Sequence, residues 1–163
     1  MTLAVGLFHN TNNLLNVITD ICTSETCLSM NGPNGEFFVC FLIPTWCETS
    51  NMNLSSTSNL LECVFNWQDD RGKNMRVSAP QYYDFAMTWC QQRLTNQDIF
   101  PTKFGDQFPD DYMMYIKRIM SVLWAVICHI YHVHWIQIKG MVKLEVCNSL
   151  LTNKLKFLTV KKN

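Results

Sequence analysis

The sequences DICTSETC, residues 20–27, and CHIYHVHW, residues 128–135, decide how this chain is organised. Each contains a pair of potential metal ligands with four residues between its members: Cys22 and Cys27, then His129 and His134. Closed structural zinc sites use four nitrogen or sulfur ligands in a tetrahedron, and two local pairs are a common way to supply them. The two pairs therefore predict a structural Zn²⁺ centre that joins distant parts of the chain.

The spacing of the histidines raises a geometric question. On a regular helix, side chains five positions apart point about 140° from each other, so His129 and His134 can face one ion only if the helix tightens or bends locally. Zinc-finger histidine pairs nevertheless tolerate roughly three to five intervening residues. His132 is a competing ligand, because it lies three positions after His129. The alternative to a metal centre is a set of buried free thiols with a hydrogen-bonded core histidine.

Composition indicates one intracellular globular domain. The chain has 163 residues, of which 48% are apolar and 12% aromatic, so it can build a substantial core. Its formal net charge is zero, which gives no electrostatic footprint for nucleic acid or an anionic membrane. The N-terminal sequence MTLAVGLFHNTNN lacks the basic start of a signal peptide. We therefore expect the eight cysteines to be reduced, and a cytoplasmic protein with the nucleus as a second compartment.

One apolar stretch has the length of a membrane span. Residues 119–138, IMSVLWAVICHIYHVHWIQI, contain no formal charge and are long enough to cross a bilayer. Three histidines in the second half argue against this, because polar side chains are costly in hydrocarbon. A fully buried central helix has the same hydropathy. We predict such a core helix, beginning after Pro109 with Asp110 and Asp111 and ending at Gly140.

Two further helices are expected. Ser78 and Pro80 in SAPQYYDFAMTWCQQRL provide an N-cap and an early helical proline. Core side chains then recur at helical spacing at Tyr82, Phe85, Ala86, Trp89 and Cys90. A shorter stripe leads into the first cysteine, at Leu14, Leu15 and Ile18.

The remaining stretches are expected to be irregular. Residues 31–35, NGPNG, form a turn that cannot continue a helix. Residues 39–64 have no clear period and are typical of a long loop or an insertion. Residues 96–108 form a connector, and residues 149–163 form a lysine-rich, divergent tail. We predict a single domain over residues 1–163.

Several motifs together resemble the Mob family of kinase regulators. They are, in this order and spacing, ETCLSM, SAPQYYDFAMTW, IFPTKFGDQFPDDY and HIYHVHW. WQDDRGK followed by RVSAPQYYDF, and IFPTKFG, resemble the second animal subclass more than the Hippo-pathway coactivators. The resemblance implies an all-α, Mob-type helical bundle around a four-helix core. It also implies that Cys22, Cys27, His129 and His134 hold structural zinc, with His132 outside the metal shell.

The departures from the family are informative too. Against the family pattern the chain is shortened at both ends, and residues 39–64 are inserted. Coactivator-type Mob proteins bind phosphorylated peptides through three basic side chains, and the matching positions here are Ser121, Val122 and Ala125. These side chains cannot pair with a phosphate, so we expect no phosphopeptide binding. Lys117 and Arg118, one turn earlier, are expected to form a solvated helix face.

The resemblance implies a non-catalytic, zinc-stabilised adaptor that binds and modulates NDR/LATS-type serine/threonine kinases. One alternative is a divergent or truncated product that keeps the zinc core but no longer binds a kinase. Another is a small intracellular zinc metalloenzyme that uses the histidine cluster. Catalysis is disfavoured because a hydrolytic zinc keeps one coordination position for water, and four protein ligands leave none. The sequence also lacks a glycine loop of the kind that binds phosphates.

Overall fold

The computed structural model describes residues 2–33, 62–103, 105 and 107–138. Within these residues the chain is mainly helical with short strands, so the all-α expectation is only partly confirmed. The elements in chain order are α1 (Thr2–Ile18), β1 (Asn31–Pro33), β2 (Glu62–Val64), β3 (Trp67–Gln68), β4 (Asn74–Met75), α3 (Ala79–Thr95), α4 (Tyr112–Val133) and α5 (Trp135–Ile138).

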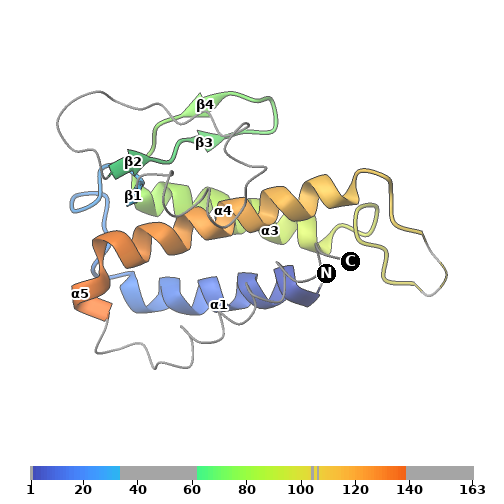
Figure 1. Cartoon of the computed structure of the whole chain (residues 1–163), viewed down its shortest axis with the longest axis horizontal. Coiled ribbons are helices and arrows are strands. Elements are labelled where there is room, and N and C mark those ends of the chain that lie inside the picture. Colours follow the sequence, from blue (N-terminus) through green and yellow to red (C-terminus); the bar gives the residue numbers. More distant parts are fainter. Residues whose placement is uncertain (1, 34–61, 104, 106, 139–163) are drawn as a thin grey trace.

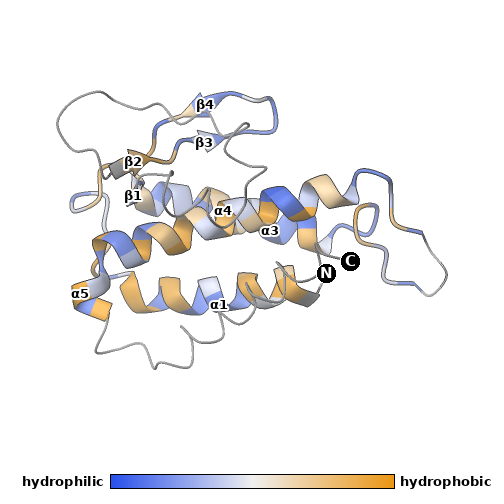
Figure 2. Cartoon of the chain, in the orientation of Figure 1, coloured by the Kyte–Doolittle hydropathy of each residue, from blue (hydrophilic) through white to orange (hydrophobic). Residues whose placement is uncertain are grey.

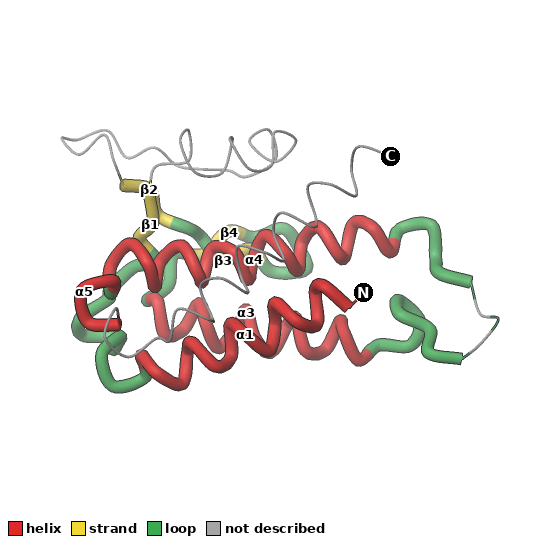
Figure 3. Tube along the Cα trace, turned by 60° about the horizontal axis from the view of Figure 1, so that its bottom comes forward, coloured by secondary structure: helices red, strands yellow, loops and turns green. Residues whose placement is uncertain are grey.

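Among the described residues, three long helices make up most of the structure. Helices α1 and α4 lie side by side and run in the same direction, whereas α3 runs in the opposite direction (Figure 1). The C-terminal ends of α1 and α4 therefore meet at one end of the bundle, where α3 begins. The strands lie together on one side of the helices (Figure 3). This arrangement brings the loop after α1 close to the last turn of α4.

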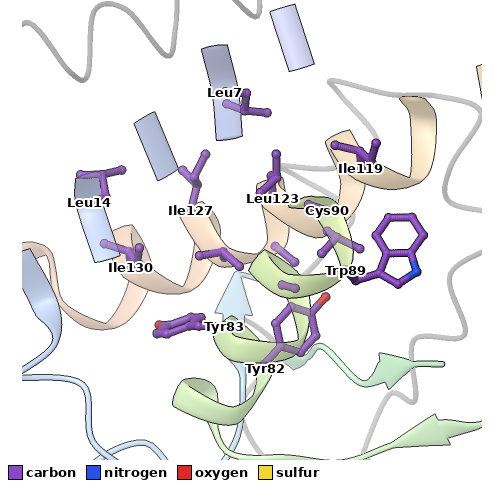
Figure 4. Close-up of a cluster of buried hydrophobic side chains, with 14 of the residues drawn as sticks. Leu7, Leu14, Tyr82, Tyr83, Trp89, Cys90, Ile119, Leu123, Ile127 and Ile130 are labelled. Atoms are coloured by element: carbon purple, nitrogen blue, oxygen red, sulfur yellow. The ribbon is translucent and has the colours of Figure 1, made fainter. Parts of the chain in front are cut away.

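The core lies between the three helices. Apolar residues recur along α1 and α4, while the loop between β3 and β4 is hydrophilic (Figure 2). Leu14 of α1 and Leu123 of α4 are almost fully buried, and α3 adds Cys90 (Figure 4). Burying one such aliphatic side chain stabilises the fold by about 1.5–3 kcal/mol. Most of the apolar residues that recur at helical spacing in the sequence are thus buried where these helices contact one another.

Helix α4 is the apolar helix that the sequence predicted. By length and composition alone it could cross a membrane. Its apolar residues instead pack against α1, α3 and β1, as expected of a central core helix. Its start after Asp111 agrees with the prediction, but its end does not. The helix stops at Val133 rather than Gly140, which lies outside the described residues, because the backbone departs from helical geometry at His134.

The start of α3 matches its prediction. Ser78 is the N-cap in an extended conformation, and its backbone N–H donates to Gln81 Oε1 at 3.4 Å. Pro80 lies in the first turn, where its missing N–H is tolerated. Of the five residues predicted to form its core stripe, only Phe85 is not buried, and its ring packs against Trp67 at 5.8 Å.

The strand pairs correct two of the loop predictions. Residues 31–33, expected to be part of a turn, form β1, and residues 62–64, at the end of the predicted insertion, form β2. The two strands pair antiparallel, with Gly32 opposite Cys63. Gly32 is required here because a Cβ at this position would overlap the Phe65 ring. The rest of the predicted insertion and the predicted tail lie outside the described residues.

The β3–β4 hairpin is attached to the helices by a charged and aromatic cluster. The guanidinium of Arg118 lies 4.6 Å from the ring centroid of Trp89 and donates to the Gln68 carbonyl at 2.7 Å. Asp70 accepts from Trp89 Nε1 at 2.8 Å and from Arg93 Nη2 at 2.6 Å. The prediction of a solvated face is therefore wrong for Arg118, which is held in place by the ring of the buried Trp89 and by the hairpin carbonyls of Gln68 and Asp69.

Candidate metal centre

Cys22, Cys27, His129 and His134 come together at the end of the bundle. Their potential ligand atoms all lie within 4.8 Å of one another, and all four residues are buried. The cysteines belong to the loop after α1. His129 belongs to the C-terminal part of α4, just before its last turn, and His134 is the residue that follows the helix. The fold thus assembles the four residues that the two sequence pairs predicted.

The cysteine pair is shaped by a compact loop. Helix α1 ends as the backbone N–H of Cys22 donates to the Ile18 carbonyl at 2.8 Å. The chain then turns back, because the N–H of Cys27 donates to the Thr23 carbonyl at 2.9 Å and Thr26 Oγ1 accepts from the Thr23 N–H at 2.9 Å. The Cys27 carbonyl in turn accepts from the N–H of Ala79, which fastens the loop to the start of α3.

The histidine pair resolves the spacing problem by ending the helix. His129 lies inside α4, but His134 is its C-cap, with φ −111° and ψ 10°. Its N–H still donates to the Ile130 carbonyl at 3.0 Å, so the departure from the helix begins at His134 itself. This change of direction allows both imidazoles to face the cysteines. His132 is exposed and does not belong to the cluster.

Two of the distances between donor atoms match those around a tetrahedral zinc ion. Cys22 Sγ lies 3.7 Å from His129 Nε2, and Cys27 Sγ lies 3.4 Å from His134 Nε2. Zn–S bonds of about 2.3 Å and Zn–N bonds of about 2.0 Å at tetrahedral angles require an S···N separation of about 3.5 Å. Two thiolates and two imidazoles are also the donor set of many structural zinc sites. The residues present therefore fit this metal.

A backbone carbonyl orients one of the imidazoles. His129 Nδ1 lies 2.7 Å from the Asn31 carbonyl oxygen, which can only accept a hydrogen bond. The proton of the neutral ring is therefore on Nδ1, and the lone pair of Nε2 is directed at the cysteines. Metal-bound histidines commonly have such a second bond. Strand β1 thus takes part in the site, although nothing in the sequence around Asn31 indicated it.

A phenol group also reaches the cluster. The hydroxyl of Tyr83 lies 3.4 Å from Cys22 Sγ, and its ring meets the His129 ring edge-on at a centroid distance of 5.9 Å. Nothing in the sequence distinguishes Tyr83 as part of a metal site. It follows Tyr82 in α3, and only the packing of α3 on the other helices shows which tyrosine faces the cysteines.

Burial controls the protonation of the cluster. Removal from water raises the pKa of Cys22 to about 12, and the neighbouring Cys27 adds to this effect. Burial lowers the pKa of His129 to about 4 and also lowers that of His134. The imidazoles are therefore neutral at pH 7, as metal ligands must be. A bound dication would offset the cost of burying two thiolates.

The positions that match the coactivator phosphopeptide site face inward. Val122 and Ala125 are buried in the core, and Ser121 is half-buried. Lys117 is exposed, as expected, whereas Arg118 is engaged with the hairpin. This segment of α4 therefore contributes packing rather than positive charge.

The sequence profile of the Mob1/phocein family matches residues 36–160, a range that includes both histidines of the cluster. The chain is 32% identical over 145 residues to MOB kinase activator 2 of Mus musculus, covering 89% of this chain and 48% of the relative. The human protein of the same name is 31% identical over the same length, with 48% of it covered.

A relative from Dictyostelium discoideum, MOB kinase activator-like 1 homolog A, is 30% identical over 152 residues, covering 93% of this chain and 59% of that protein. The chain thus spans about half the length of the mouse and human relatives. The extent of the profile match confirms the resemblance that the sequence motifs indicated. The chain belongs to the Mob1/phocein family.

Proposed function

We propose that this protein is a non-catalytic, zinc-stabilised adaptor that binds and modulates a serine/threonine kinase of the NDR/LATS type. The observation that carries the proposal is its membership of the Mob1/phocein family, together with mammalian relatives named as kinase activators. In this proposal residues 1–163 act as a single domain, in the cytoplasm and the nucleus.

Zinc has a structural part in the proposal. Cys22, Cys27, His129 and His134 would hold it, and the bound ion would supply a permanent link between the loop after α1 and the end of α4. Both segments also contact the start of α3 or strand β1, through Ala79 and Asn31. Because ligands such as these converge only in the folded state, the free energy of metal binding contributes directly to folding.

The same geometry supports an adaptor in preference to a metalloenzyme. With zinc bound, the four buried protein donors would complete a tetrahedral coordination shell. Hydrolytic zinc requires a position for water or substrate in that shell. The burial of Cys22 and Cys27 also disfavours a nucleophilic thiolate, which needs access to substrate.

The test is binding of the zinc-loaded chain to the purified regulatory region of an NDR/LATS-type kinase, measured by calorimetry. We expect a saturable complex, and assays of kinase activity with and without the chain then distinguish activation from competitive inhibition. The same measurement with His134→Ala, which removes one of the four proposed ligands, shows whether kinase binding depends on zinc. If the folded, zinc-loaded chain binds no such kinase, the result would favour the first alternative, a divergent or truncated product that keeps the zinc core but no longer binds a kinase. Zinc-dependent hydrolysis that is lost in His134→Ala would favour the metalloenzyme.

A further inference from the structure

Tyr83 is a residue of α3 whose side chain contacts the cluster of Cys22, Cys27, His129 and His134. Its side chain points toward the end of the bundle where α4 finishes, whereas the neighbouring Tyr82 points the opposite way, toward Trp89 (Figure 4). Tyr83 is 8% exposed, and its hydroxyl lies 3.4 Å from Cys22 Sγ. The ring of the same residue packs against His129. Tyr83 therefore contacts one sulfur ligand and one nitrogen ligand from opposite halves of the site.

The direction of the Tyr83–Cys22 hydrogen bond depends on the state of the sulfur. With a protonated thiol, either group can donate. A metal-bound cysteine is a thiolate and has no proton, so the bond then requires the tyrosine O–H as donor. A phenol is protonated at neutral pH and can fill this role. Hydrogen bonds to a charged acceptor are about twice as strong as neutral ones.

We propose that Tyr83 is a positioning residue of the metal centre, which donates a hydrogen bond to the Cys22 thiolate while its ring holds the His129 imidazole in place. The inference rests on the zinc site proposed above. Through Tyr83, α3 would also contribute to the metal site, although all four ligands come from the loop after α1 and from the end of α4.

A purely space-filling role does not account for the hydroxyl. A phenylalanine would supply the same ring to the core, whereas a buried hydroxyl is unfavourable unless it is hydrogen-bonded. Cys22 Sγ satisfies it here. The bond withdraws charge from the sulfur, so its removal should alter both the strength and the electronic structure of the metal–sulfur bond. Partners of this type usually change metal affinity by about 10–100-fold.

The experiment compares Tyr83→Phe with Tyr82→Phe in the full chain. Tyr82 is adjacent and also buried, but it points the opposite way from Tyr83, and its ring packs edge-on against Trp67 at a centroid distance of 5.6 Å. Zinc affinity is measured by competition with a chromophoric chelator. Co²⁺ is then substituted, and the sulfur-to-cobalt charge-transfer band is recorded. We expect Tyr83→Phe to weaken zinc binding by at least about tenfold and to move the band to longer wavelength, and Tyr82→Phe to change neither.

The possible outcomes are distinct. If the unmodified chain does not bind zinc, the proposed zinc site itself is wrong. If it does, and Tyr83→Phe matches it in affinity and in the cobalt band, only the inference about Tyr83 is overturned. Equal changes in both variants would also overturn it, because they would reflect general packing. Should Tyr83→Phe unfold, recovery by excess zinc supports the inference, and failure to recover contradicts it.

Discussion

Cys27 Sγ and His134 Nε2 lie 3.4 Å apart although 107 positions separate the two residues in the sequence. Cys27 follows the end of α1, and His134 follows the end of α4. These two helices run in the same direction. A metal ion between them would therefore close a loop that contains most of the described fold. Opening this link should affect the whole bundle rather than one local segment.

Cys27→Ser should lower the melting temperature of the zinc-loaded chain by more than about 10 °C, because several kcal/mol of metal-binding free energy are lost and each is worth about 2–4 °C at this size. Removal of zinc with a chelator should have the same effect on the unmodified chain. Thermal unfolding followed by circular dichroism measures both. Cys63→Ser is the control, since a hydroxyl can also donate to the Pro33 carbonyl that Cys63 Sγ contacts. An unchanged transition after verified metal removal would refute a structural role for zinc.

His134→Ala should abolish stoichiometric zinc binding, whereas His132→Ala should retain one zinc per chain. His134 Nε2 faces the cysteines, and His132 is exposed outside the cluster. Elemental analysis of the purified chain after dialysis gives the ratio directly. The opposite result, with zinc lost only from His132→Ala, would show that the wrong histidine has been assigned as a ligand.

Phosphopeptides should not bind the surface of α4 that matches the coactivator site. Val122 and Ala125 are buried and carry no charge, so the charge-assisted bonds that phosphate requires cannot form there. Calorimetric titration with a phosphothreonine peptide and its unphosphorylated twin should give no phosphate-dependent gain in affinity. Phosphate-specific binding that disappears in Lys117→Ala would contradict this expectation and would locate the pocket one helical turn earlier.

Arg118→Ala should destabilise the fold by about 1–3 kcal/mol, because it removes a cation–π contact with Trp89 and a charged hydrogen bond to the Gln68 carbonyl. Lys117→Ala is the matched control. Lys117 is the exposed neighbour on the same helix, and its removal should change the free energy of unfolding by less than about 0.5 kcal/mol. Urea denaturation of both variants provides the comparison, and equal stability of the two would show that Arg118 does not anchor the hairpin.

The sequence by itself determined the features that depend on near neighbours. Apolar residues at helical spacing indicated the three long helices, and Ser78 with Pro80 marked the start of α3. The paired spacing of cysteines and histidines indicated the residues that the fold brings together, although only the family resemblance distinguished His134 from His132 before the structure did. Such patterns are legible because helix periodicity and capping are properties of a few consecutive residues.

The tertiary structure decided the rest, because it depends on partners far away in the chain. Helix α4 ends at Val133, and the imidazole of the next residue, His134, faces Cys27, which lies more than a hundred residues earlier. The pairing of residues 31–33 with 62–64 turns predicted loop segments into strands, and the Asn31 carbonyl thereby reaches His129. The contacts of Tyr83 with Cys22 and of Arg118 with Gln68 likewise join residues that are far apart in the sequence. Which face of a helix meets which partner is set by packing, since local sequence specifies a periodicity but not the neighbour that it will contact.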